Sequence, residues 1–226
     1  MFKNSQEEIN FFAVNENLTC SVKNIYKDYK IGIVDNFYKN PKQIQKLALE
    51  IPPTFKKNIA SGIPGGRVAV SYNFDFLAPI FNQLINDIYM QDTIIFNCQE
   101  QMEHATFCVN VTSQTESLPN KVPHIDGMEG FAVGIFLNDD KDCIGGTSFY
   151  TYKKNIAPTT YPDGDLSIEN YPGYIMEDYK DFKKVYLAEM KFNRMIIYPK
   201  KLLHTAYIPD NSFDCETPRL IQMFFI

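Results

Sequence analysis

The sequence has no tryptophan, only three histidines and no long apolar run. A membrane-spanning helix needs roughly 18–20 apolar residues, and no stretch approaches that length. The five cysteines are odd in number and form no Cys-x-x-Cys pair, which argues against a disulfide framework. Free thiols are typical of a reducing compartment, and the opening "MFKNSQEEINFF" is too polar for a signal peptide. We therefore expect a cytoplasmic protein without a membrane partner.

An excess of positive charge is also missing. The formal net charge is −5, whereas proteins that bind duplex nucleic acid usually carry a basic surface. The balance argues against a duplex partner but leaves room for a basic pocket. With 45% apolar and 22% charged residues and no repeat or low-complexity tract, residues 1–226 are predicted to form a single globular domain.

The first part of the chain, residues 1–91, is predicted to supply a strand and helical support. "KIGIVDNFY" (30–38) indicates a short strand. Asn40 as N-cap and Pro41 at the first helical position predict a helix over 40–50. Apolar residues at helical spacing predict a second helix over 74–90.

From residue 92 onward the pattern is β-rich. Short runs such as "GFAVGIFLN", "RMIIYP" and "RLIQMFFI" alternate with turn residues. We expect an α+β, mostly β fold, in which a jelly-roll core (92–226) is buttressed by the N-terminal helices. The insertion 155–181 is predicted to be a long loop ending in a short helix. Whether it is a substrate lid or a variable loop stays open.

The segment "KVPHIDG" places a histidine and a carboxylate two residues apart, His124 and Asp126. In an extended chain, such residues project to the same face. The pair could hold a metal, relay a proton or form a surface ion pair. Far downstream, His204 opens another extended run after a Pro-containing turn. Two imidazoles and one carboxylate could occupy one face of an octahedral metal and leave three positions open, as in non-haem Fe(II) oxygenases.

Arg219 begins the otherwise apolar terminal run "RLIQMFFI" and is expected to point inward. A buried guanidinium needs an anionic partner, and its planar fork suits a carboxylate. That partner could be a dicarboxylic keto acid. It could instead be structural, with Asp214 or Glu216 as the acid.

These residues together resemble the Fe(II)/2-oxoglutarate-dependent dioxygenase superfamily, especially its prolyl-4-hydroxylase-like branch. The resemblance covers about the last half of the chain. It rests on His124-x-Asp126, the Leu137-Asn138 strand end, the Gly145-Gly146 turn, His204 after "YP", and Arg219.

The resemblance implies a double-stranded β-helix fold. It also implies an enzyme that couples the oxidative decarboxylation of 2-oxoglutarate by O2, which yields succinate and CO2, to the hydroxylation of a C–H bond. His124, Asp126 and His204 would be the catalytic Fe(II) ligands, and Arg219 would grip the distal carboxylate of 2-oxoglutarate. Halogenating relatives lack a ligand at the position of Asp126, so hydroxylation is favoured.

The sequence departs from many relatives at Phe136, where a tyrosine would hydrogen-bond the keto acid. Tyr150 and Tyr198 are the candidates to replace it. An inserted loop before Arg219 also makes its spacing from His204 longer than in many relatives.

Several alternatives stay open. Gly145-Gly146 could be a plain hairpin turn. The whole chain could be a non-catalytic jelly-roll binding or structural protein with a vestigial metal site. The substrate could be an amino acid, a peptidyl side chain or a small metabolite, and a homodimer is compatible with the sequence.

Overall fold

In a computed structural model of the chain, the described residues are 5–50, 66–69, 74–89, 106–110, 122–152, 175–209, 212–213 and 216–226. They form two antiparallel sheets and a few helices, which confirms the α+β, mostly β class. Among them, no helix is both long and apolar enough to cross a membrane.

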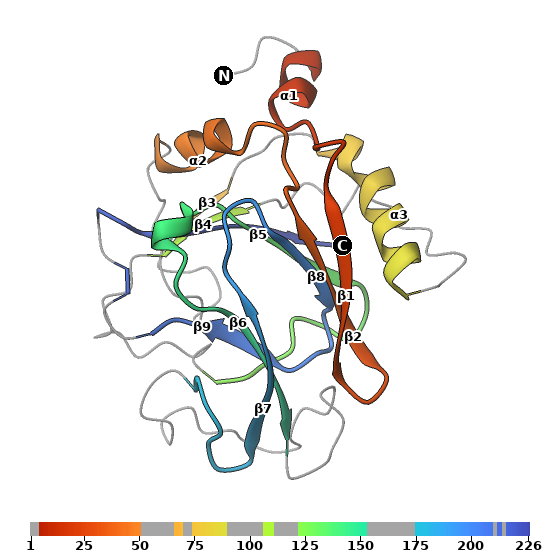
Figure 1. Cartoon of the computed structure of the whole chain (residues 1–226), viewed down its shortest axis with the longest axis vertical. Coiled ribbons are helices and arrows are strands. Elements are labelled where there is room, and N and C mark those ends of the chain that lie inside the picture. The colour runs from red at the N-terminus through yellow and green to blue at the C-terminus, as the bar shows by residue number, and fades with distance from the viewer. Residues whose placement is uncertain are drawn as a thin grey trace.

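The larger sheet has seven strands (Figure 1). In spatial order they are β1 (Thr19–Tyr26), β2 (Tyr29–Asp35), β8 (Met195–Pro199), β5 (Phe131–Phe136), β10 (Arg219–Phe225), β4 (Thr106–Asn110) and β3 (Gly66–Ala69). Segments from both ends of the chain therefore lie side by side. The sequence predicts one strand and supporting helices for residues 1–91. The described part of these residues supplies the helices and three strands of this sheet, β1, β2 and β3.

The smaller sheet has three strands in the order β7 (Phe182–Glu189), β6 (Gly146–Tyr152) and β9 (His204–Tyr207). The segment before β5 joins its edge through a single bridge between His124 and His204. From β7 onward, successive strands alternate between the small and the large sheet, and β5 and β6, which follow one another in the chain, do not pair. The Gly145-Gly146 turn is consequently not the turn of a β-hairpin; the chain crosses there from the large sheet to the small one.

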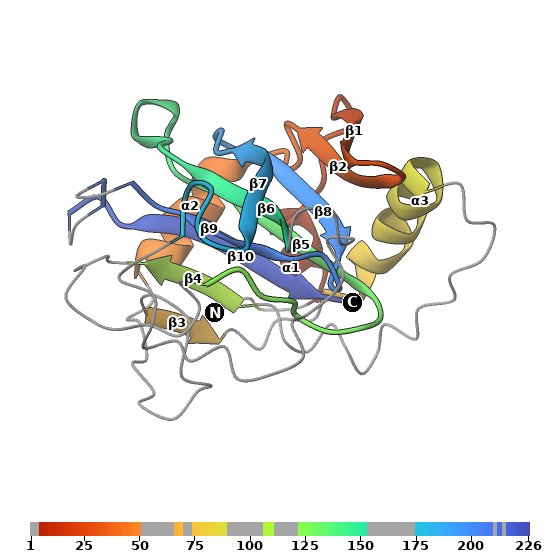
Figure 2. The ribbon, with the colours of Figure 1, turned by 90° about the horizontal axis from the view of Figure 1, so that it is seen from below.

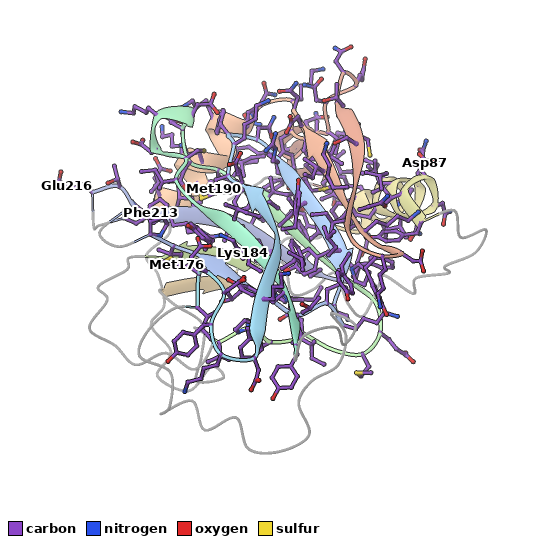
Figure 3. All side chains as sticks on the ribbon, turned by 60° about the horizontal axis from the view of Figure 1, so that its bottom comes forward. Asp87, Met176, Lys184, Met190, Phe213 and Glu216 are labelled. Atoms are coloured by element: carbon purple, nitrogen blue, oxygen red, sulfur yellow. The ribbon has the colours of Figure 1, made fainter. Side chains whose placement is uncertain are left out.

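The helices are α1 (Ser5–Phe11), α2 (Pro41–Glu50) and α3 (Ala78–Tyr89), which follows a short 3-10 turn, Asp75–Leu77. The predicted helices over 40–50 and 74–90 are confirmed by α2 and α3, whereas α1 was not predicted. Helical spacing places Phe81, Leu84, Ile85 and Ile88 on one buried face of α3. On the other face, the exposed Asp87 points away from the sheets (Figure 3).

The two faces of the large sheet pack against different partners. One face is covered by the helices, whose buried side chains join those of Val133, Ile197 and Phe224 in one cluster. The other face is covered by the small sheet, and Phe149 and Ala188 of that sheet pack in a second cluster. The helices accordingly lie on one side of the large sheet and the small sheet lies on the other (Figure 2).

Two predicted segments lie wholly or mostly outside the described residues. The run "TIIFN" (93–97), which is rich in β-branched and aromatic residues and predicts a further strand, lies wholly outside them, and so does most of the insertion 155–181. The described end of the insertion, residues 175–181, forms a bend and a turn that leads into β7. The short helix predicted for the end of this insertion is not present in residues 175–181.

Candidate metal centre

Main-chain hydrogen bonds hold the two histidines opposite each other. The N–H of His124 donates to the carbonyl of His204, and the reverse bond also forms, each with an N···O distance of 2.9 Å. This reciprocal pair is the closely spaced arrangement of antiparallel strands. Their rings are 4.7 Å apart between centroids. The backbone therefore brings together two imidazoles from distant parts of the chain.

Asp126 completes the group. One carboxylate oxygen lies 3.2 Å from Nε2 of His204, and the other lies 3.7 Å from Nε2 of His124. The backbone N–H of Asp126 donates to the carbonyl of Lys200, in the turn that leads to β9. The sequence prediction that His124 and Asp126 share one face is confirmed by this geometry.

The hydrogen bonds of the ring nitrogens orient both imidazoles. Nδ1 of His124 is 3.1 Å from the carbonyl of Val122, and Nδ1 of His204 is 2.9 Å from the carbonyl of Leu202. Because a carbonyl can only accept, each Nδ1 carries the proton. In the neutral form of each ring, Nε2 is left with a lone pair directed to the space beside Asp126. Metal-binding histidines in proteins are commonly oriented by this kind of bond.

The charges of the group are coupled. Burial, reinforced by the charge of His204, lowers the pKa of His124 to about 4. Burial would also lower the pKa of His204, but the nearby carboxylate of Asp126 outweighs it and raises that pKa. A single positive charge beside Asp126 is thus favoured, and a second one is opposed. A divalent cation could take the place of that proton.

The donor atoms fit a metal ion. All three lie within 4.8 Å of one another. Two ligands at right angles around a metal at about 2.1 Å would be roughly 3 Å apart, close to the shorter separations here. The side chains are only partly accessible, with 22% of His124, 18% of Asp126 and 7% of His204 exposed. The group could therefore hold a metal ion and still admit a small ligand.

Arg219 lies between the two sheets, as its position in the sequence predicted. It is 3% exposed. Its Nη2 donates to the carbonyl of Gly146 at 3.2 Å, and its guanidinium carbon lies 5.6 Å from the centre of the Phe136 ring. Glu216 is exposed on the connection that precedes β10 (Figure 3). Asp214, the other acid considered as a structural partner, lies outside the described residues.

The two candidate tyrosines occupy different environments. The ring of Tyr198 packs edge-on against His204, with centroids 4.9 Å apart. Burial raises the pKa of Tyr198, the charge of Asp126 raises it further and that of Arg219 lowers it. The Tyr198 hydroxyl is therefore close enough to interact electrostatically with both Asp126 and Arg219. Tyr150 belongs to a separate cluster and donates its hydroxyl to the carbonyl of Ile175 at 2.5 Å.

Gly145 and Gly146 have a structural role that composition alone did not reveal. A Cβ atom on Gly145, whose φ is +81°, would lie 2.1 Å from the carbonyl of Tyr207. A Cβ atom on Gly146 would lie 2.0 Å from the carbonyl of Ala188. Real Cβ atoms do not approach that closely, so β6 can sit between β7 and β9 at this point only without side chains. The close approach also places the carbonyl of Gly146 against Arg219.

Comparison with known proteins gives a family but no activity. No curated protein matches the chain. The sequence model of a family described as "Family of unknown function (DUF6445)" matches residues 16–225, which include every residue of the candidate site. The chain therefore belongs to the DUF6445 family.

Proposed function

We propose that this protein is a non-haem oxygenase that uses Fe(II) and 2-oxoglutarate to hydroxylate a C–H bond. The observation that carries the proposal is the convergence of His124, Asp126 and His204, with both Nε2 atoms directed to the carboxylate. Two imidazoles and one carboxylate with open positions are the ligand set of non-haem ferrous oxygenases.

The strand order supports a double-stranded β-helix. From β4 onward, successive segments lie in the large sheet (β4), at the edge of the small sheet (His124), and in the large sheet (β5). Two strands of the small sheet follow, β6 and β7, and then β8, β9 and β10 alternate between large and small sheets. Such alternation winds the chain around a shared interior, as jelly-roll barrels do. His124 and His204 lie in the two segments that meet at the edge of the small sheet.

Arg219 would bind the distal carboxylate of 2-oxoglutarate. Its face of β10 is shared by Ile221, which packs in the cluster between the sheets. A buried guanidinium forms strong, directional hydrogen bonds with a carboxylate. Tyr198 lies within electrostatic reach of both Asp126 and Arg219, so it is the better candidate to donate a hydrogen bond to the keto acid. Tyr150 is the weaker one because its hydroxyl already donates to Ile175.

In this mechanism the protein contributes position and exclusion of water. Iron with 2-oxoglutarate and O2 would supply the oxidising chemistry, with succinate and CO2 as products. The two histidines and Asp126 would hold the metal from one side and leave the opposite side to small ligands. Tyr198 and Phe149 pack against His204 and shield the ligands from bulk water. The substrate would be a small metabolite, an amino acid or a peptidyl side chain that reaches the exposed edge of Asp126.

The proposal can be tested by anaerobic titration of the protein with Fe(II) and 2-oxoglutarate. We expect a weak visible charge-transfer band and, after admission of O2, succinate release that one substrate pool stimulates. Asp126→Asn should remove the band. Asp139→Asn is the matched control, because this half-exposed carboxylate pairs with Lys42 on the surface. If the wild-type mixture stays colourless while the protein is folded, a non-catalytic binding or structural role replaces the oxygenase.

A further inference from the structure

Asn138 holds the backbone on both sides of Arg219. Its Nδ2 donates to the carbonyl of Pro218 at 2.9 Å, and its Oδ1 accepts from the N–H of Leu220 at 2.7 Å. The side chain is buried, with the residue 4% exposed. Both ends of the amide are therefore used, and the residue between its two partners is the arginine.

We call this pair of hydrogen bonds the Asn138 clamp. It replaces the hydrogen bonds that β5 would otherwise make with the start of β10. On the β4 side, the ladder of β10 extends to Arg219, which pairs with Asn110. On the β5 side, the ladder stops at the pair of Ile221 with Phe136. Beyond that pair, the backbone N–H of Leu137 still donates to the carbonyl of Leu220, and then the Asn138 side chain takes over. A side-chain amide thus serves as the neighbouring strand where Arg219 begins β10.

The start of β10 needs such support because it follows the long connection 208–218. Arg219 carries a long, flexible side chain that loses rotamer entropy when it is ordered. Its guanidinium contacts the Gly146 carbonyl and the Phe136 ring, and both contacts depend on where the Cα atom of Arg219 lies relative to the small sheet. Asn138 fixes the position of that Cα atom because it bonds the backbone of the residue before Arg219 and of the residue after it.

We infer that Asn138 is a positioning residue for Arg219 and thereby determines affinity for the carboxylate end of a keto acid. This inference rests on the proposed function. Asn138 would act through Arg219 and would not touch the ligand itself. Its removal should weaken recognition of the distal carboxylate and leave metal binding and chelation of the keto-acid end unchanged.

A second buried asparagine provides a matched control. Asn193 clamps Tyr38 in the same manner, with Nδ2 donating to the Tyr38 carbonyl and Oδ1 accepting from its N–H, each at 2.8 Å. Both asparagines are buried. Asn193→Ala removes two hydrogen bonds of the same kind at a site that holds Tyr38 and not Arg219. Because Asn193 has a φ of +61°, where alanine is strained, the control is the more disruptive of the two substitutions.

The experiment compares two ligands of the Mn(II)-loaded protein by calorimetry. One is 2-oxoglutarate, and the other is 2-oxopentanoate, which has a methyl group where 2-oxoglutarate has its distal carboxylate. We expect wild type and Asn193→Ala to prefer 2-oxoglutarate. Asn138→Ala should lose most of that preference through a drop of about tenfold or more in 2-oxoglutarate affinity, the order found when a supporting group is removed. Affinity for 2-oxopentanoate should not change.

A double-substitution cycle separates positioning from general damage. If Asn138 acts through Arg219, then Asn138→Ala should cost nothing further in an Arg219→Ala background. If Asn138→Ala does not fold, Asn138→Ser, whose hydroxyl is too short to bridge both backbone groups, should show a smaller loss of the same preference.

The outcomes distinguish the two proposals. If Asn138→Ala or Asn138→Ser folds and keeps the full wild-type preference, the positioning role is overturned and the proposed function stands. An equal loss of preference in Asn193→Ala would also overturn it, because any buried clamp would then have the same effect. If wild-type protein binds Mn(II) but neither keto acid, the proposed function fails and the role of Asn138 fails with it.

Discussion

The two faces of the large sheet bury polar groups in different ways. On the helix-covered face, the hydroxyl of Tyr38 donates to the side-chain carbonyl of Gln222 at 2.8 Å, in an otherwise apolar cluster. On the face toward the small sheet, two of the buried residues, Arg219 of the large sheet and His204 of the small sheet, can carry charge. The first arrangement joins neutral partners and holds elements together. The second concentrates charge where a ligand could enter.

Burial alone therefore does not mark a functional site in this protein. Tyr38 and Arg219 are almost equally inaccessible, at 0% and 3% exposed. Neutral partners stabilise each other, whereas a buried charge is costly unless a counter-charge or ligand compensates it. Substitutions on the helix-covered face should therefore change stability, and substitutions on the other face should change binding.

The largest effect on binding should follow from the loss of a metal ligand. His204→Ala leaves two ligands of three, so binding of Mn(II) should weaken by more than about 100-fold, beyond the loss caused by removing a supporting group. Added metal should raise the thermal unfolding midpoint of wild type, since a ligand that binds only the folded state stabilises it. The variant should show no such rise. A metal-dependent rise of wild-type size in His204→Ala would place the metal elsewhere.

The largest effect on folding stability belongs to the helix-covered face. Phe224 is 1% exposed and packs edge-on against Phe74 and Phe81. Phe224→Ala should lower the free energy of unfolding by about 3–5 kcal/mol, as expected for a large buried aromatic side chain. Denaturant titration measures the loss. Metal affinity of the folded fraction should stay at the wild-type value, and a parallel loss would contradict the separation of the two faces.

A smaller effect is expected at Tyr38. Tyr38→Phe removes the donor to Gln222 and leaves the buried amide carbonyl without that bond, which should cost about 1–3 kcal/mol in free energy of unfolding. Chemical denaturation at neutral pH measures this cost, with affinity for 2-oxoglutarate as the second measurement. We expect that affinity to be unchanged. A specific loss of keto-acid binding would mean that the two faces communicate through β10.

The smallest effect is expected at the Arg194–Asp35 ion pair, which joins the end of β2 in the large sheet to the end of β7 in the small sheet. Arg194 grips Asp35 through two nitrogens, at 2.6 and 3.1 Å, and also donates to the carbonyl of Glu189 at the end of β7. The hydrogen bond from Arg194, followed by that from Lys191, lowers the pKa of Asp35. Asp35→Asn should cost about 1 kcal/mol near neutral pH, the upper end for partly exposed pairs.

The pH dependence of that cost has a definite sign. A carboxyl whose pKa is lower in the folded state contributes stability above its unfolded pKa, about 3.9. That contribution is lost as the pH falls through the folded value. The difference in unfolding free energy between wild type and Asp35→Asn should therefore shrink below about pH 4. A difference that is independent of pH would show that the pair contributes through packing and not through charge.

Local patterns in the sequence predicted a large part of this fold. Asn40 and Pro41 marked the start of α2, and the spacing of Phe81, Leu84 and Ile88 marked the buried face of α3. Both signals are local, because capping and helical periodicity depend on neighbours within a few residues. β1 was not predicted: its residues 19–24 are exposed, so burial imposes no alternation of apolar and polar residues there.

The candidate site was predictable where its geometry is local and unpredictable elsewhere. The spacing of His124 and Asp126 determines that they share a face, whatever the fold. The choice between Tyr150 and Tyr198 depends on which cluster each strand faces, and a shift in the pairing of β6 with β7 between Phe149 and Tyr150 affects that face. Strand registers and bulges are set by packing between distant segments, so a single sequence does not reveal them.

The kinds of donor available follow from the residue types alone: two imidazoles, one carboxylate and one guanidinium within β-rich segments. That the imidazoles of residues 124 and 204 face each other, and that Asn138 spans the backbone around Arg219, follows from the packing of the folded chain. The two kinds of property differ in the distance along the chain over which they act. Chemical identity and local periodicity are properties of neighbouring residues, whereas convergence depends on how two sheets pack across segments far apart in the chain.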